Sequence, residues 1–308
     1  MSEFKLTTPV GFIIFNRPDT TARVFAEIAK ARPTKLLIIG DGPRPHKAGE
    51  AERVAVTRKI IAQVDWPCEV LTNFSDVNLG CKKRVSSGID WIFKEVEEAI
   101  VLEDDCLPDP TFFRFCQEML EHYRHDSRIG MISGDNFQLK RPPDAESYYF
   151  SKYTHIWGWA TWRNRWKDYD VDMRLWPQVR DQGRLQDLVL EKTEVSYWRS
   201  IFERVYKGKI DTWDYQWSFA NWCMGRINIL PSVNLISNIG FGLEATRTVI
   251  PSPLADLPTQ AMRFPLFHPE IQIRSRGADR ISDRRCFRRP LLPRVYRWVM
   301  FHIKRWVS

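Results

Sequence analysis

The chain of 308 residues lacks the cysteine spacing of a disulfide framework or a zinc site. Its six cysteines include no C-x-x-C pair and no pattern that suggests zinc with the scattered histidines, so we expect reduced thiols. No apolar run approaches the length of a membrane span, and residues 1–10 lack the basic and apolar regions of an export signal. We therefore expect a cytoplasmic protein, peripheral on the cytoplasmic face of the membrane.

Three motifs of nucleotide and acyl chemistry are also missing. The chain has no G-x-G-x-x-G after its first apolar run, no G-x-x-x-x-G-K-[ST] and no G-x-S-x-G. These absences disfavour a dinucleotide dehydrogenase, a phosphate-loop hydrolase and a hydrolase with a serine elbow. No internal repeat or low-complexity block is present, and 44% hydrophobic residues are ample for a packed core.

The positive charge of the chain is concentrated in its C-terminal tail. The net charge is +8, and residues 274–308 contain eleven Arg and Lys against two Asp. Within this tail, apolar residues on one helical side predict an amphipathic helix in an anionic membrane surface. A terminal helix packed on the domain is the alternative, and nucleic acid is not expected because the basic excess lies outside the ordered motifs. The apolar residues are Val295, Trp298, Val299, Ile303 and Trp306.

Residues 99–105, AIVLEDD, carry the most specific signal in the chain. A short apolar run predicts a buried strand of a parallel sheet, and Glu103, Asp104 and Asp105 follow its carboxyl end. Open α/β sheets bind ligands at that end. Three adjacent carboxylates repel one another, so a hard cation such as Mg²⁺ or Mn²⁺ would stabilise them. A solvated acidic turn closed by Pro108 is the alternative.

Apolar runs and helical patterns alternate over the first 105 residues. The runs at 10–15, 36–39, 68–71 and 99–102 predict strands joined by right-handed crossovers into a largely parallel sheet. Arg17 and Asp41 each follow one of these strands, so they should gather with the acidic triplet at one sheet edge. Arg17 would reach phosphate or base and Asp41 would accept from base or ribose. Each also has a plain interpretation as a turn residue.

The second half of the chain is rich in aromatic residues, notably in residues 148–176. Its helical patterns cover residues 185–206 and 212–224. The spacing of Trp159, Trp162 and Trp166 suits one helical face, which favours a core role. If a tryptophan is functional, a sugar ring stacking on Trp157 or Trp159 is the natural proposal. His155 is either a candidate general base or an ordinary hydrogen-bonded histidine.

Four segments in a fixed order resemble one family. EDD ends a strand and precedes PDPTFFRFCQEMLEHY, and WGWATW, TWDYQWSFANW and NIGFG follow later. This order resembles glycosyltransferases of the GT-A fold, especially the N-acetylglucosaminyltransferase I type, over most of residues 8–242. The resemblance implies a Rossmann-type α/β/α sandwich with a mixed, mostly parallel sheet and an aromatic-rich acceptor half.

The same resemblance implies roles for individual residues on the donor side. Asp105 would bind the catalytic metal, Mn²⁺ or Mg²⁺, while Glu103 and Asp104 would serve the nucleotide sugar. The family also has a basic residue or histidine near the start of the preceding helix, where this chain has Lys82 and Lys83. Either lysine is a candidate phosphate contact, and two exposed lysines are the alternative. Arg17 and Asp41 would flank the nucleotide.

The resemblance places the catalytic base at Asp214, which follows Trp213. The family has a second acidic residue next, whereas this chain has Tyr215. A carboxylate opposite the leaving diphosphate would take the proton of an acceptor hydroxyl, and one displacement inverts the anomeric carbon. Asp214 as an acid in a first helical turn is the alternative. Trp157, Gly158, Trp159 and Trp213 would form the sugar pocket.

The expected organisation has three parts. Residues 1–140 form a nucleotide-sugar-binding half, residues 141–250 form the acceptor and catalytic-base half of the same domain, and residues 251–308 form the basic tail. The expected function is that of an inverting, metal-dependent glycosyltransferase that moves a sugar from a nucleotide-diphosphate sugar to a hydroxyl of a cell-surface glycan or lipid-linked precursor. A sugar nucleotidyltransferase and a non-catalytic, membrane-associated nucleotide-binding module are the alternatives.

Overall fold

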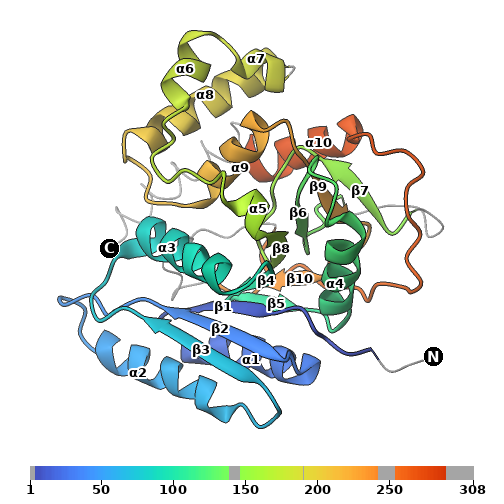
Figure 1. Ribbon diagram of the computed structural model, residues 1–308. Helices are drawn as coiled ribbons and strands as arrows, with labels where there is room; N and C mark the ends of the chain where they lie inside the picture. The colour runs from blue at the N-terminus through green and yellow to red at the C-terminus, as the bar shows by residue number, and fades with distance from the viewer. Residues whose placement is uncertain (1–3, 139–145, 190, 242–253, 289–308) are drawn as a thin grey trace, which may run out of the picture.

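The computed structural model describes residues 4–138, 146–189, 191–241 and 254–288 (Figure 1). Its strands are β1 (Val10–Ile14), β2 (Lys35–Gly40), β3 (Glu69–Phe74), β4 (Glu98–Glu103), β5 (Cys106–Pro108), β6 (Ile129–Ser133), β7 (Tyr148–Ser151), β8 (Trp159–Trp162), β9 (Ile227–Pro231) and β10 (Ile236–Asn238). Its helices are α1 (Pro18–Ala31), α2 (Glu50–Ile60), α3 (Gly80–Glu95), α4 (Thr111–Tyr123), α5 (Arg163–Trp166), α6 (Trp176–Asp181), α7 (Leu185–Leu188), α8 (Lys192–Tyr206), α9 (Asp214–Cys223) and α10 (Arg276–Ser282), with short helical turns η1 (Ile61–Gln63) and η2 (Asp283–Phe287).

One eight-stranded sheet runs through both halves of the chain, in the order β3-β2-β1-β4-β8-β6-β9-β7. The strands β3, β2, β1 and β4 are mutually parallel, as the alternating pattern of the first 105 residues predicts. Beyond β4 the pairing is mixed, because β8 runs antiparallel to both β4 and β6, while β6 and β9 are parallel. The predicted mixed, mostly parallel sheet is therefore confirmed.

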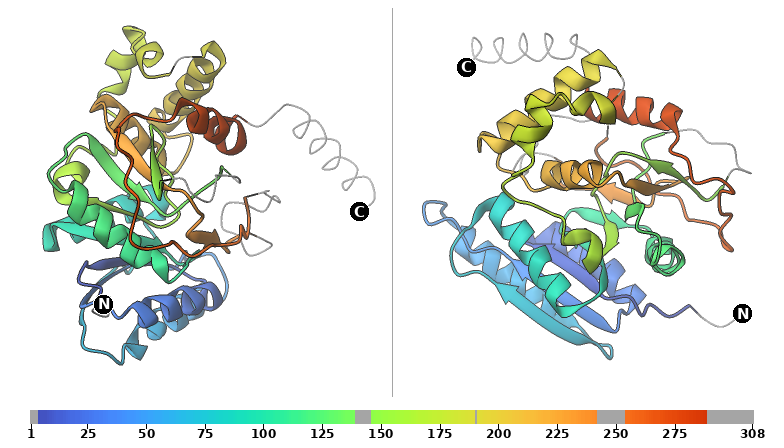
Figure 2. Two further views of the ribbon diagram at one scale, coloured as in Figure 1. Left: turned by 90° about the vertical axis from the view of Figure 1, so that its right-hand side faces the viewer. Right: turned by 45° about the horizontal axis from the view of Figure 1, so that its top comes forward.

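Helices cover both faces of this sheet, which confirms the predicted α/β/α sandwich (Figures 1 and 2). Successive strand residues point to opposite faces. Phe12 of β1 accordingly packs with Phe25 of α1 in one core, whereas Ile13 packs with Ile89 of α3 in the other. The two cores hold the carboxyl ends of the parallel strands in a fixed register, with Ile13 opposite Glu103.

The aromatic segment at residues 157–166 differs from its sequence prediction. Trp159 and Trp162 lie on strand β8, and only Arg163–Trp166 is helical. Residues three apart on a strand face opposite sides, so Trp159 joins the core under α3 and Trp162 joins the core under α4. The helix expected over residues 185–206 is likewise divided into α7 and α8. Pairing of β8 with β4 and β6 outweighs the local helical spacing.

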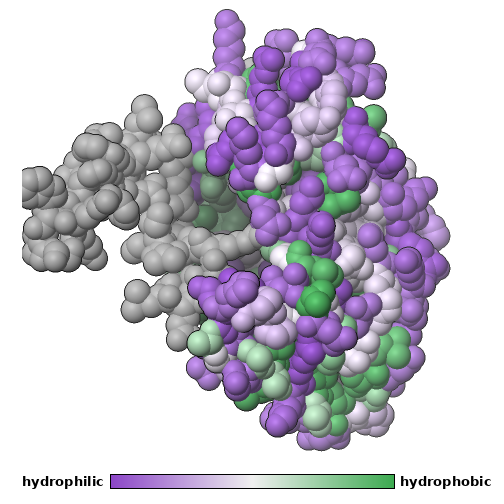
Figure 3. All heavy atoms as spheres, turned by 90° about the vertical axis from the view of Figure 1, so that its left-hand side faces the viewer, coloured by the Kyte–Doolittle hydropathy of each residue, from purple (hydrophilic) through white to green (hydrophobic). Residues whose placement is uncertain are grey.

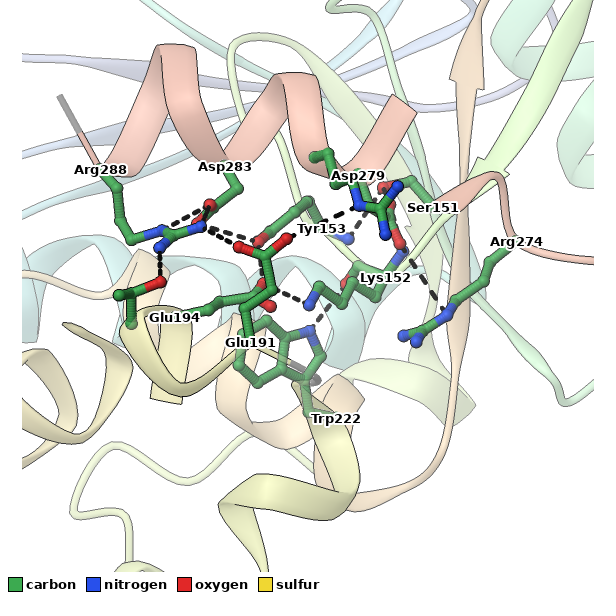
Figure 4. A network of polar contacts seen from close by, with 12 residues as sticks. Ser151, Lys152, Tyr153, Glu191, Glu194, Trp222, Arg274, Asp279, Asp283 and Arg288 are labelled. Atoms are coloured by element: carbon green, nitrogen blue, oxygen red, sulfur yellow. Dashed lines mark hydrogen bonds and ion pairs between the residues drawn. The ribbon is translucent and has the colours of Figure 1, made fainter. Parts of the chain in front are cut away.

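A network of charged and hydroxyl side chains fixes the segment after β10 to the aromatic half (Figure 4). Lys152 pairs with Glu194 inside the protein, and Tyr153 donates to the same carboxylate. Asp279 of α10 accepts from Ser151 at 2.6 Å. Further along, Asp283 and Glu191 both accept from Arg288. The network therefore holds α10 and η2 against β7 and α8.

None of the helices in the described part of the chain is long and apolar enough to span a membrane. The amphipathic helix expected around residues 294–306 falls outside the described residues.

Candidate active site

A cavity of about 590 Å³ opens where strands β1, β2 and β4 end. Its volume lies within the range of about 300 to 1,000 Å³ that is usual for small-molecule sites. Figure 3 views the molecule from this side and shows the surface hollowed there. The cavity brings together most of the residues that the sequence singled out, namely Arg17, Asp41, Glu103, Asp104, Asp105, Trp157, Trp213 and Asp214.

Arg17 links two members of the acidic triplet. Its guanidinium donates to Asp104, and its Nη1 donates to Asp105 Oδ2 at 3.0 Å. Although burial opposes the charge, the two carboxylates raise the pKa of Arg17. The backbone nitrogen of Phe15 also donates to Asp104 Oδ2 at 3.1 Å. Asp104 therefore holds β1 and Arg17 in place. The charge of Arg17 also screens the repulsion between Asp104 and Asp105.

Glu103, the last residue of β4, lies beside the two other acids of the triplet. Burial, followed by the charges of Asp105 and Asp104, raises the pKa of Glu103 to about 8. Asp214 contributes to the same shift, so this carboxylate lies near Glu103. In its protonated form Glu103 can donate a hydrogen bond, whereas an ionised carboxylate can only accept.

The position of Asp41 suggests a contact with base or ribose, but its hydrogen bonds go to the protein itself. Its Oδ1 accepts from the backbone nitrogens of Gly42 and Leu79, both at 2.9 Å. Its Oδ2 accepts from Asn78 Nδ2 and from the backbone nitrogen of Gly80, both at 3.1 Å. A carboxylate has about four acceptor positions, and these four donors fill them. Asp41 therefore anchors the turn that begins α3, although it also lines the cavity.

Asp214 lies at the first position of α9 and faces the cavity from the second half of the chain. The hydroxyl of Thr212 donates to Asp214 Oδ1 and orients the carboxylate. Tyr215, at the place of the second acidic residue of the family pattern, is turned into the aromatic core beside Trp198. Glu103 and Asp211 are further carboxyl groups that line the same cavity, and the charge of Asp214 contributes to the raised pKa of Glu103.

The four residues of the expected sugar pocket divide into two groups. Trp157 and Trp213 line the cavity, and the backbone nitrogen of Trp157 donates to buried Asp135 at 3.0 Å. Trp159 is fully buried with its ring 5.7 Å from that of Trp213, so it supports the cavity wall from behind. Gly158 has a φ of +72°, and a side chain there would collide with Ile236. Gly158 and Trp159 thus shape the wall without reaching the cavity.

The structure places a different basic residue of α3 on the cavity. Lys82 and Lys83 do not line it, whereas Cys81, Arg84 and Val85 do. Positions i, i+3 and i+4 share one helical face, which explains this choice. Arg84 donates from Nε to the carbonyl of Gly40 at 3.2 Å and thereby ties α3 to the end of β2. This spacing can be read from the sequence, and it separates Cys81, Arg84 and Val85 from Lys82 and Lys83.

His155, the alternative base, does not line the cavity. It is buried, packs edge-on against Phe137 at 4.7 Å, and its Nε2 lies 3.2 Å from the hydroxyl of Ser282. Burial lowers the pKa of His155 to about 3, so the ring is neutral at pH 7. The ordinary hydrogen-bonded interpretation fits this histidine.

Asp105 is the residue that fits the expected metal ion. In the described parts of the chain, no three side chains of His, Cys, Asp or Glu form a metal-binding group. Mg²⁺ and Mn²⁺ at nucleotide sites need only one or two carboxylates, because phosphate and water fill the remaining positions. Arg17 engages Asp105 Oδ2, while Oδ1 contacts the weakly donating thiol of Cys106 at 3.4 Å. Oδ1 is therefore available to a cation.

Gly240, from the NIGFG segment, closes this side of the cavity. A Cβ atom at this position would lie 2.1 Å from Asp105 Oδ2 and 2.7 Å from Arg17 Nη1. Any other residue would push the carboxylate or the guanidinium aside, so the close approach of the backbone requires glycine. The ring of neighbouring Phe241 lies 5.8 Å from that of Trp157. The NIGFG segment thus connects the acidic triplet with the aromatic wall.

No protein-family model and no curated protein sequence matches the chain. Solved structures that it resembles include TarS 1-349 of S. aureus, with a TM-score of 0.41 and 7% identity over 75% of this chain. The match spans 60% of that TarS structure's length.

Two further solved structures belong to enzymes named in their descriptions. UDP-glucose pyrophosphorylase complexed with UDP-glucose has a TM-score of 0.33 and 9% identity, over 73% of this chain and 90% of that one. Mouse xyloside xylosyltransferase 1, in its apo form, has a TM-score of 0.32 and 12% identity, over 70% and 82%. All of these TM-scores lie below 0.5, so the likenesses do not decide the function of this chain.

Proposed function

We propose that this protein is an inverting, metal-dependent glycosyltransferase that uses a nucleotide-diphosphate sugar. The main support is the juxtaposition, in one cavity, of the Arg17 and acidic-triplet cluster with a carboxylate from the opposite half of the chain, Asp214. A cationic and carboxylate-rich wall suits a diphosphate with its metal ion. A separate, oriented carboxylate suits general-base chemistry on an incoming hydroxyl. The described residues contain both parts.

In the proposed reaction the acceptor hydroxyl attacks the anomeric carbon of the donor sugar in one displacement. Asp214 takes the hydroxyl proton while the new C–O bond forms and the bond to the diphosphate oxygen breaks. Thr212 keeps one carboxylate oxygen of Asp214 occupied, so the other oxygen is the one that faces the hydroxyl. Because attack and departure occur on opposite sides of the carbon, its configuration inverts.

On the donor side, Arg17 would hold the departing diphosphate. Its position is fixed by Asp104 and Asp105, so little side-chain entropy is lost when the donor binds. A divalent ion on Asp105 would neutralise charge on the diphosphate oxygens as the leaving group departs. Trp157 and Trp213 would supply apolar faces for the sugar rings.

Titration of UDP, GDP and dTDP, each with Mn²⁺, tests the donor site. We expect one of these nucleotides to bind, and the variant Asp105→Ala or addition of EDTA to weaken binding by about two orders of magnitude, because the ion supplies several kcal/mol of charge stabilisation. Asp65→Ala removes an exposed carboxylate and should change nothing. Equal binding by Asp105→Ala would rule out the metal role. Release of pyrophosphate from a nucleoside triphosphate would instead indicate a nucleotidyltransferase.

We also propose that the acceptor is a cell-surface glycan or its lipid-linked precursor, used at an anionic membrane surface. The support is the basic excess of residues 274–308, of which Arg276, Arg280 and Arg284 are exposed in the described part. A surface-bound enzyme would meet a lipid-linked acceptor without diffusion through the cytoplasm.

Sedimentation with vesicles that contain phosphatidylserine tests this location. Each basic residue near such a surface contributes about 1 kcal/mol, so Arg294→Ser with Arg297→Ser should weaken vesicle binding roughly 30-fold. Arg23→Ser with Lys30→Ser removes the same charge from α1 and should leave binding unchanged. If both double variants bind equally, the tail does not recognise the membrane.

A further inference from the structure

Arg44 lines the same cavity, and Glu50 accepts hydrogen bonds from both its backbone and its side chain. Its backbone nitrogen donates to Glu50 Oε2 at 2.7 Å. Its Nε lies 3.1 Å from Glu50 Oε1 and 3.0 Å from Oε2, and its Nη2 also donates to Oε1. One carboxylate therefore fixes both the backbone and the side chain of Arg44, within the loop between β2 and α2.

The partner in this ion pair is fully buried. Glu50 has 0% of its side chain exposed, and Asn16 Nδ2 donates to its Oε1 at 2.8 Å. The hydrogen bonds from Arg44 are the main reason that the pKa of Glu50 is lowered. Burying a carboxylate costs free energy, and a partner whose side chain is 39% exposed offsets only part of that cost. The arrangement is better explained as orientation of the guanidinium than as stabilisation of the loop.

Part of the Arg44 guanidinium has no hydrogen-bond partner in the described part of the chain. Arg44 Nη1 has no hydrogen-bond acceptor among the described residues, and 39% of the side chain is exposed. The guanidinium carbon lies 5.7 Å from the centre of the Phe15 ring, and Phe15 lines the cavity as well. A fixed guanidinium plane beside an aromatic ring is suited to a planar base with acceptor atoms.

We propose that Arg44 binds the base of the donor nucleotide and that Glu50 is its positioning residue. This inference rests on the proposed function, because it assigns one end of the same cavity. Asp41, the residue that the sequence suggested for this contact, has its acceptor positions filled by the turn before α3. Arg17 lies with the acidic triplet, which suits the diphosphate end. Arg44 and Phe15 are left for the base.

Isothermal titration of UDP, GDP and dTDP, each with Mn²⁺, into the wild type and Arg44→Ala tests the assignment. A hydrogen bond from a charged donor contributes about 1.5 to 3 kcal/mol, so the preferred nucleotide should bind roughly 10- to 100-fold more weakly. Discrimination among the three bases should also shrink. Arg53→Ala, which removes an exposed arginine of α2 outside the cavity, is the matched control and should bind like the wild type.

Two further variants separate positioning from folding. Glu50→Gln should weaken binding several-fold and reduce base discrimination, and the double variant Arg44→Ala with Glu50→Gln should bind no more weakly than Arg44→Ala alone. The double variant leaves no unpaired buried charge, so it tests Arg44 even if Arg44→Ala unfolds. Thermal melting of each variant verifies the fold.

Each other outcome overturns the assignment. If the wild type binds a nucleotide and the Arg44 variants bind it equally well, Arg44 is not a ligand contact, while the proposed function stands. If all three nucleotides weaken by the same factor, Arg44 contacts a group that they share, the diphosphate or the sugar ring, and the assignment to the base fails. If the wild type binds none of them with Mn²⁺, the proposed function and this inference fall together.

Discussion

Replacing Asp214 by Asn should reduce the rate of sugar transfer by about 10²- to 10⁴-fold, which is the usual contribution of a general base. The amide keeps the size of the side chain and can still accept the hydroxyl of Thr212, but it cannot take a proton from the acceptor. Nucleotide binding should stay within about a factor of two. Product formation with a panel of nucleotide sugars, together with titration of the free nucleotide, measures both quantities.

The matched control for this experiment is Asp172→Asn, which makes the same chemical change on an exposed carboxylate away from the cavity. It should transfer sugar at the wild-type rate. If Asp214→Asn retains full transfer activity, the base lies elsewhere. If it loses nucleotide binding and transfer together, Asp214 belongs to the donor site and not to the acceptor side of the reaction.

The residues that the sequence located best are those that follow parallel strands. Arg17, Asp41 and the triplet at residues 103–105 come after β1, β2 and β4, and parallel strands bring their carboxyl ends to one edge. Sequence position was therefore enough to place them in one cavity. It was not enough to describe Asp41, because three of the four donors to its oxygens belong to a turn almost 40 residues later.

The predictions that failed depended on contacts between distant segments. Helical spacing at Trp159, Trp162 and Trp166 gave the wrong element because β8 is formed by pairing with β4 and β6, which local spacing does not report. Glu50 resembles any acid in the first turn of a helix, and only the folded loop shows that it is buried beneath Arg44. Arg44 also follows β2, three residues after Asp41. The expectation that polar residues after a parallel strand line the site therefore applies to Arg44 as well.

Removing the carboxylate of Glu194 should lower the free energy of unfolding by about 3 to 5 kcal/mol, the usual cost of breaking a buried ion pair. Glu194 and Lys152 each have only 8% of the side chain exposed, and Tyr153 also donates to Glu194 (Figure 4). Glu194→Ala leaves the ammonium of Lys152 without its acceptor and leaves the phenol of Tyr153 only its 3.4 Å contact with Asp283. Urea unfolding measures the change.

The control for Glu194→Ala is Glu121→Ala, because Glu121 is also paired with an arginine but has 73% of its side chain exposed. An exposed pair contributes about 0 to 1 kcal/mol, so this variant should unfold almost like the wild type. Lys152→Met with Glu194→Leu should recover much of the loss, because apolar side chains of similar size leave no charge unpaired. A loss from Glu194→Ala as small as that of the control would mean that water reaches Lys152, and the buried pair would then not explain how α8 is held against the residues after β7.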